Sequence, residues 1–129
     1  MHLGYIIVYV ADVEAALAFY ERAFGIGRRF LHPSGDFGET EMEGARLAFT
    51  SHALGATAVP VAYSPLDPQA SPVGVELTLI AADVDAAFAE AVAHGATPLK
   101  EPQDEPWGQR VSYVRDPFGV LVGIATAMD

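Results

Sequence analysis

The sequence contains no cysteine, and only 7 of its 129 residues are lysine or arginine. The lack of cysteine excludes disulfides, thiolate metal ligands and a cysteine nucleophile, and it is compatible with the cytoplasmic location that we expect. The 17 aspartates and glutamates give a formal net charge of -10. Nucleic-acid backbones and anionic membrane surfaces both attract clustered basic residues. This composition therefore argues against either of them as a partner.

Long apolar runs and several catalytic motifs are missing as well. No apolar run approaches the roughly 20 residues that span a bilayer. The apolar start, MHLGYIIVYVAD, has no lysine or arginine ahead of it, so we predict a first strand there and not a signal peptide. The chain has no phosphate loop, GxSxG elbow or HExxH pair, which argues against a nucleophilic hydrolase. With 51% hydrophobic residues, the chain is expected to form a single globular domain over residues 1–129.

An internal repeat is the most informative feature of the sequence. Residues 5–25 align with residues 76–95, and the letters DVEAA in the first copy match DVDAA in the second. In each copy an apolar strand leads into an aspartate that can cap the following helix, and a further acidic residue favours the positive end of the helix dipole. Glycines at positions 25 and 95 are placed to end these helices.

Three extended segments are predicted after each helix. In the first half they lie near residues 28–31, 38–42 and 45–51, and in the second half near residues 98, 109–114 and 120–126. The letters DPFG before the last strand are typical of a tight turn. Each half therefore has the order βαβββ, which predicts an α+β fold. Its modules are residues 1–52 and 73–129, and the segment 53–72, rich in Ala, Pro and Gly, is interpreted as a linker.

This organisation resembles a known family. Two βαβββ modules, helices that begin DVEAALAFY and DVDAAF, and the ending WGQRVSYVRDPFGVLVGIAT are similar to the vicinal oxygen chelate superfamily, also called the glyoxalase, bleomycin-resistance protein and extradiol dioxygenase superfamily. The resemblance implies that the modules form a curled mixed sheet, a half-barrel with a helix on the outside of each module, and that the protein is a homodimer. It leaves the reaction open, because this fold hosts lyases, epimerases, dioxygenases, thiol transferases and drug-sequestering proteins.

The resemblance also bears on metal binding. Metal-dependent relatives carry one ligand, typically His or Glu, on each of four strands, and these positions correspond here to Tyr5, Ala48, Glu76 and Gly123. Only Glu76 is a good ligand for a divalent cation, whereas a catalytic site needs three or four nitrogen and oxygen donors. We therefore expect no catalytic metal. At position 123 a glycine replaces a ligand and leaves room in the cavity.

Strand alternation assigns candidate ligand-binding residues to the inner face, opposite the helices. They are Tyr5, Tyr9, Arg46, Glu76, Thr78 and Gly123, and Trp107, which precedes a strand, is a further candidate. The tyrosines offer rings for stacking and hydroxyl groups for hydrogen bonds, and Trp107 could close a pocket mouth. For Glu76 two interpretations stay open, because its carboxylate can bind a ligand or can form a structural ion pair with Arg46.

We accordingly expect the protein to enclose a small, partly aromatic molecule in a cavity between the modules, without a catalytic metal. An acidic cavity favours a cationic or neutral ligand unless Arg46 reverses the local sign. The alternative is a metal-dependent enzyme of the glyoxalase or dioxygenase type, a lyase, isomerase or dioxygenase that uses Glu76 together with His32 or His52. A third interpretation is a module without a ligand, whose cavity is filled by its own side chains.

Overall fold

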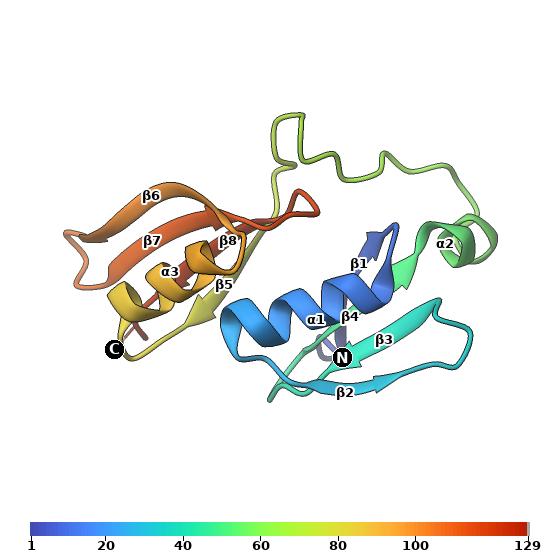
Figure 1. Cartoon of the computed structure of the whole chain (residues 1–129), viewed down its shortest axis with the longest axis horizontal. Coiled ribbons are helices and arrows are strands. Elements are labelled where there is room, and N and C mark those ends of the chain that lie inside the picture. The colour runs from blue at the N-terminus through green and yellow to red at the C-terminus, as the bar shows by residue number, and fades with distance from the viewer. Residues whose placement is uncertain (129) are drawn as a thin grey trace. The chain divides into compact units, whose positions relative to one another are not determined.

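The computed structural model describes residues 1–128, which divide into two compact units. Unit 1 is Met1–Pro65 and unit 2 is Leu66–Asp129. The boundary falls inside the segment that was interpreted as a linker. Each unit contains a four-stranded mixed sheet and one longer helix that lies across a face of it (Figure 1). The predicted α+β class with two modules is confirmed.

Unit 1 has its four strands and first helix in the predicted order. Its elements are β1 (Tyr5–Val10), α1 (Val13–Phe24), β2 (Arg28–Leu31), β3 (Phe37–Thr40), β4 (Arg46–Ser51) and α2 (His52–Ala58). The strand order in space is β1-β4-β3-β2. The first strand, β1, runs parallel to β4, and the other pairings are antiparallel. The last strand of the module is therefore inserted between its first and third strands.

Unit 2 repeats this topology, as the internal similarity predicted. Its elements are β5 (Glu76–Ile80), α3 (Val84–Ala93), β6 (Thr97–Asp104), β7 (Arg110–Arg115) and β8 (Leu121–Ala125). The strand order is β5-β8-β7-β6, with β5 parallel to β8. Strand β6 is longer than expected, because irregular register with β7 lets it continue past the prolines at positions 98 and 102.

The predicted aspartate caps start both long helices. Asp12 Oδ1 accepts a hydrogen bond from the backbone N of Ala15, and Asp83 Oδ1 accepts one from Ala86, each at 3.0 Å. Gly25 ends α1 with a φ of 70°, a left-handed conformation that favours glycine. Within residues 1–128, no helix combines the length and apolar character that crossing a membrane requires.

The core of unit 1 lies between α1 and its sheet. Phe49 on β4 and Tyr20 on α1 are fully buried, with ring centroids 5.1 Å apart. Gly38 on β3 allows the helix to approach closely, because a Cβ atom there would lie 2.5 Å from Leu17 Cδ1. In unit 2, Val114 on β7 is likewise fully buried. These contacts fix which face of each sheet the helix covers.

The segment after β4 corrects one expectation. It was interpreted as a linker with an extended piece, but residues His52–Ala58 form helix α2. Ser51 caps this helix, because its Oγ accepts a hydrogen bond from the backbone N of Leu54 at 3.1 Å and donates one to Asp36 Oδ1 at 2.7 Å. The alanines of HALGATA favour helix, and a serine cap directly before them is a helix start that the linker interpretation overlooked.

Arg115 attaches the far end of the same segment to the sheet of unit 2. Its guanidinium donates hydrogen bonds to the backbone carbonyls of Asp67, Pro68 and Ala70 at 2.6–3.2 Å, and to that of Gly119 at 3.2 Å. Part of the segment predicted to be a linker is therefore held by the β7–β8 hairpin.

Candidate functional site

Exposed and buried side chains distinguish the two faces of each sheet along β1 and β5. In β1, Tyr5 is 49% exposed while Val10 is 3% exposed. In β5, Glu76 and Thr78 are exposed while Leu77 is buried. The register pairs Tyr5 with Arg46 and Thr78 with Gly123, and residues paired in this way lie on the same face. Tyr5 and Arg46 thus share one face of the unit 1 sheet, and Thr78 and Gly123 share one face of the unit 2 sheet.

Glu76, Thr78 and Gly123 form one compact group in unit 2. Thr78 Oγ1 donates a hydrogen bond to Glu76 Oε2 at 2.5 Å. A Cβ atom built on Gly123 would lie 2.6 Å from Glu76 Oε2 and 3.4 Å from Thr78 Oγ1. The carboxylate of Glu76 thus lies over the backbone of Gly123. The absence of a side chain at position 123 is what gives it that space.

Unit 1 contains a charged cluster that the sequence analysis missed. Glu39 on β3 is only 4% exposed, and its Oε2 lies 3.0 Å from Arg29 Nη1 and 3.5 Å from Arg46 Nη1. Glu39 is paired in register with Ala48, which places its side chain on the same face as Arg46. The sequence did contain a signal for this cluster, because Glu39 is a glutamate within a predicted strand. Because Glu76 belongs to the other unit, its pairing with Arg46 stays a hypothesis.

Tyr9 belongs to an aromatic group around α2. Its ring centroid lies 4.8 Å from that of Tyr63, and Tyr63 OH lies 2.8 Å from His52 Nδ1. Gly55 on α2 makes the packing possible, because a Cβ atom there would lie 2.7 Å from Tyr63 OH. A neighbouring hollow of about 440 Å³ is lined by His52, Ala56, Val59, Pro60, Val61, Ala62, Tyr63 and Pro65. Tyr9 thus serves in part to pack α2.

Trp107 lies in unit 2, in the connection between β6 and β7. It is 58% exposed, and its Nε1 donates a hydrogen bond to Gln109 Oε1 at 2.7 Å. The Gln109 side chain in turn donates to the carbonyl of Thr126, just after β8. Glu76 instead pairs with Leu121, where β8 begins. The two candidate residues therefore lie at opposite ends of β8.

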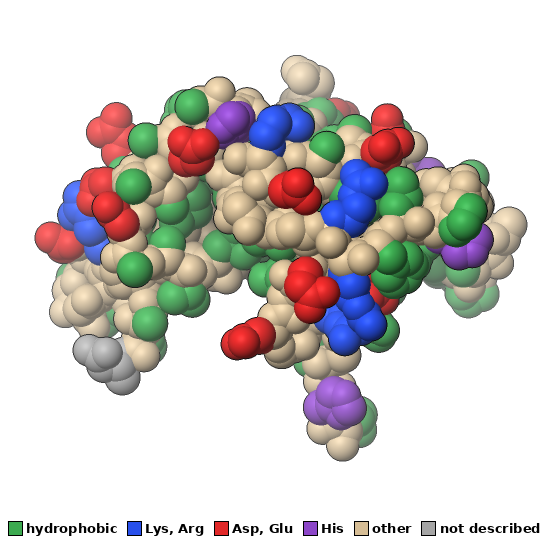
Figure 2. Space-filling model, turned by 60° about the horizontal axis from the view of Figure 1, so that its bottom comes forward, with side chains coloured by type: hydrophobic (Ala, Val, Ile, Leu, Met, Phe, Trp, Pro, Cys, Tyr) green, Lys and Arg blue, Asp and Glu red, His purple; other side chains and the backbone are tan. Residues whose placement is uncertain are grey.

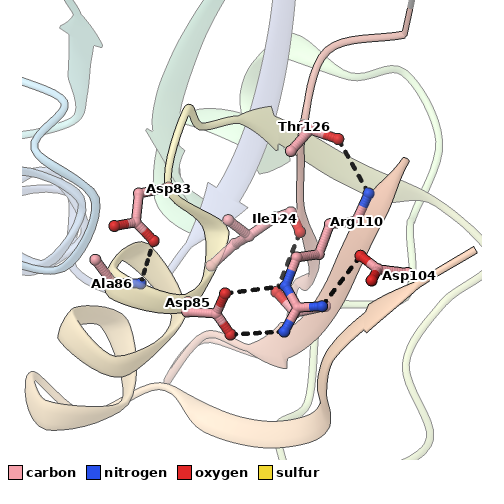
Figure 3. Close-up of polar contacts among 8 residues, drawn as sticks. Asp83, Asp85, Ala86, Asp104, Arg110, Ile124 and Thr126 are labelled. Atoms are coloured by element: carbon pink, nitrogen blue, oxygen red, sulfur yellow. Dashed lines mark hydrogen bonds and ion pairs between the residues drawn. The ribbon is translucent and has the colours of Figure 1, made fainter. Parts of the chain in front are cut away.

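Charged side chains on the surface form small mixed groups and no single large basic patch is visible on the face drawn in Figure 2. One such group fastens α3 to the sheet (Figure 3): Arg110 Nε and Nη2 each donate to Asp85 at 2.9 Å, and Nη1 donates to Asp104 at 3.1 Å. The hydrogen bonds that Arg110 donates lower the pKa of Asp85, and because the carboxylates of Asp85 and Asp104 accept them, the pKa of Arg110 is raised. Since Asp85 sits in the first turn of α3, the group has a structural role.

The residues at the four family positions do not fit a metal centre. Tyr5, Ala48, Glu76 and Gly123 provide one carboxylate and one phenol, which is too few donors for a catalytic divalent cation. In residues 1–128, no group of three or more histidine, aspartate and glutamate side chains is arranged to hold a metal ion. His32 and His52 make separate local contacts, to Ser34 and to Tyr63.

Known proteins share this architecture. A model of the Glyoxalase/Bleomycin resistance protein/Dioxygenase superfamily matches residues 2–124. A glyoxalase-related enzyme from Fulvimarina pelagi superposes with a TM-score of 0.83 and 25% identity, over 98% of this chain and 88% of its own. A family enzyme from Burkholderia phytofirmans PsJN superposes with a TM-score of 0.77 and 22% identity, over 98% of each chain.

One curated protein matches at the level of sequence. It is the uncharacterized protein Mb0911c of Mycobacterium bovis, which is 45% identical over 49 residues. The match covers 38% of this chain and 31% of that protein. The similarity is therefore local, and the chain spans less than a third of the length of this relative.

Proposed function

Because the chain belongs to the Glyoxalase/Bleomycin resistance protein/Dioxygenase superfamily, we propose that it binds a small, partly aromatic molecule and does so without a catalytic metal. The observation that carries the proposal is the position of the Glu76 carboxylate over Gly123. Metal-dependent relatives, by the resemblance, carry a glutamate ligand at the position of Gly123. A glutamate side chain there would have to displace the carboxylate of Glu76.

The Glu76 group is suited to bind a hydrogen-bond donor of the ligand. Thr78 holds Oε2 of the carboxylate, while Oε1 makes no hydrogen bond within the described residues of unit 2. A carboxylate oxygen held in this way accepts hydrogen bonds from hydroxyl or ammonium groups. We therefore assign the binding of a donor group to Glu76, with Thr78 as its positioning residue.

Each unit also offers aromatic side chains of its own. Tyr5 leaves about half of its surface exposed on the inner face of unit 1, and Tyr9 stacks on Tyr63. Exposed tyrosine rings favour planar ligands through offset stacking, and their hydroxyl groups add polar contacts. Within unit 2 the exposed ring is that of Trp107.

We also propose that the protein is a cytoplasmic homodimer. In the two sheets, β1 and β5 are each the terminal strand of their order. Terminal strands carry unpaired backbone groups that natural proteins cover or protect, and a second copy of the chain is a common cover. Light scattering coupled to size exclusion measures the mass directly, and a monomer at micromolar concentration contradicts this assignment.

The central experiment combines elemental analysis of the purified protein with ligand titrations. We expect no stoichiometric transition metal, no stabilisation by Zn, Ni, Mn or Fe, and a higher melting temperature with 2-naphthalenemethanol, because a ligand that binds the folded state stabilises it by mass action. One equivalent of bound metal, with activity lost on chelation, would instead support a lyase, isomerase or dioxygenase.

Glu76→Gln tests the assigned residue, with Glu101→Gln as the matched control. Glu101 is an exposed residue of β6 in the same unit, so the two variants change the net charge equally. We expect Glu76→Gln to weaken binding of 2-naphthylmethylammonium about tenfold or more, the range for a lost hydrogen bond to a charged group. Glu101→Gln should leave it unchanged. Equal effects of the two variants would contradict the assignment.

A further inference from the structure

We propose that the molecule bound by this protein carries a carboxylate, which Arg29 and Arg46 bind on the inner face of unit 1. The inference rests on the proposed function, because it names a chemical class for the small aromatic molecule, and its contacts lie within unit 1 alone. It starts from the cluster in which both arginines contact Glu39, at 3.0 and 3.5 Å.

The charges in this cluster do not balance. The carboxylate of Glu39 faces two guanidinium groups, so the cluster has a net charge of +1. The chain as a whole has a net charge of -10. A single arginine is sufficient to neutralise a buried glutamate. The second arginine is therefore in excess of what the burial of Glu39 requires. The surplus charge favours an anionic partner.

Both guanidinium groups also have donors to offer. Each carries five N–H bonds; Arg29 Nη1 donates one hydrogen bond to Glu39, and Arg46 Nη1 lies 3.5 Å from the same carboxylate oxygen. The side chains of Arg29 and Arg46 remain 40% and 37% exposed. A carboxylate can accept two parallel hydrogen bonds from one guanidinium, which is the strongest geometry for this pair. Glu39, which is almost fully buried, holds both groups in place before the ligand arrives.

Apolar side chains flank the cluster on the same face. Tyr5 is paired in register with Arg46, and Phe30 with Glu39. Their exposed fractions are 49% and 40%, and that of Ile7, the next inner-face residue of β1, is 42%. A hollow of about 510 Å³ next to the cluster is lined by His2, Leu3, Gly4, Tyr5, Gly44, Ala45 and Arg46. Rings beside an unbalanced positive charge complement an aromatic carboxylate, which joins a planar apolar body to one anionic end.

Three probes of nearly equal size separate this inference from the proposed function. They are 2-naphthoate, 2-naphthalenemethanol and 2-naphthylmethylammonium, titrated calorimetrically into the full chain at pH 7 and low salt. We expect 2-naphthoate to bind about tenfold or more tightly than the alcohol, and high salt to reduce the difference. If the alcohol or the ammonium compound binds and the naphthoate does not bind more tightly, the inference is wrong and the proposed function stands. If none binds, both fail.

Substitutions locate the binding to the cluster. Arg46→Gln and Arg29→Gln should each weaken naphthoate binding about tenfold to a hundredfold while leaving the alcohol within about twofold. Arg28→Gln is the matched control, because Arg28 lies on the same strand, changes the net charge equally and forms no ion pair in residues 1–128. Removing one arginine could destabilise the fold, so circular dichroism and the Glu39→Gln/Arg46→Gln double variant accompany the series.

Glu39→Gln gives a test with the opposite sign. It keeps the side-chain shape but releases both guanidinium groups from a competing carboxylate, so naphthoate should bind several-fold more tightly. If this variant and both arginine variants leave naphthoate binding unchanged, the cluster is purely structural and the inference is overturned. The same conclusion follows if the arginine variants only lower the melting temperature and naphthoate binds to none of the proteins.

Discussion

Substitution by alanine should reduce stability more at Gly38 than at Gly123, although in both strands the added Cβ atom would meet a neighbouring atom at almost the same distance. At Gly38 the neighbour is Leu17 Cδ1, at 2.5 Å, with Val13 Cγ1 at 3.2 Å. At Gly123 it is Glu76 Oε2, at 2.6 Å. Leu17 is 1% exposed and enclosed by the core, whereas Glu76 is exposed and its carboxylate can rotate away.

The expected magnitudes follow from these surroundings. Overpacking a core lowers the free energy of unfolding by about 1–3 kcal/mol. Replacing a strand glycine by alanine raises it by about 0.5–1 kcal/mol. Gly38→Ala should therefore lower the free energy of unfolding by about 0.5–2 kcal/mol. With about 2.1 cal/mol/K of unfolding entropy per residue and 129 residues, 1 kcal/mol corresponds to about 4 °C. We expect the melting temperature to fall by about 2–8 °C for Gly38→Ala and to change by less than about 3 °C for Gly123→Ala.

Thermal unfolding followed by circular dichroism measures both shifts, and titration with 2-naphthylmethylammonium reports on the site. Gly123→Ala should weaken this probe, because the Glu76 carboxylate has to leave its position over residue 123. Gly38→Ala should leave the affinity of the folded protein unchanged. A loss of stability at Gly123→Ala as large as that at Gly38→Ala would refute the reasoning, since it would mean that the carboxylate is held as rigidly as a core side chain.

Three other substitutions test the fold. Phe49→Ala removes a fully buried ring and should lower the free energy of unfolding by about 3–5 kcal/mol in urea titrations, and a loss below about 1 kcal/mol would contradict the described core. Arg110→Gln removes the hydrogen bonds that lower the pKa of Asp85. A carboxyl pKa that is lower in the folded state stabilises it above the ordinary value of about 3.9 and loses this effect as the pH falls below it. The urea midpoints of variant and wild type should thus differ at pH 7 and converge below about pH 4, and a constant difference would contradict the assignment. Arg115→Gln should speed proteolysis within residues 67–70, which this side chain holds, and an unchanged cleavage rate would show that other contacts secure the segment.

Local signals were sufficient for the order of the elements. The repeat predicted two modules, and its aspartates predicted both long helices, because a cap, an acidic first turn and an apolar stripe are properties of neighbouring residues. The family match over residues 2–124 confirms the resemblance that the repeat suggested. The missed helix α2 was also locally encoded, by Ser51 and the alanines after it. The Ala, Pro and Gly content of residues 53–72 is typical of a linker, although the alanines after Ser51 also favour a helix.

The candidate site was only partly visible from the sequence. Alternation assigned Glu76 and Thr78 to one face, and the glycine at position 123 signalled a missing side chain. That the carboxylate lies over Gly123 depends on the register between β5 and β8, whose strands are more than forty residues apart in the chain. Glu39 was missed because its neighbours are set by the pairing of β3 with β2 and β4, which includes a register shift between Arg28 and Phe30.

The sequence by itself determined the two modules, their long helices and the lack of metal-binding side chains at the three family positions other than Glu76, because these follow from residue types and short-range spacing. Only the tertiary structure decided that Arg29 and Arg46 share the carboxylate of Glu39, and that a glycine backbone lies beneath Glu76. These contacts depend on how strands pair, β3 with β2 and β4 in unit 1 and β5 with β8 in unit 2. A shift of one residue in that pairing turns every side chain to the opposite face, so the groups that meet a ligand are fixed by register and not by composition.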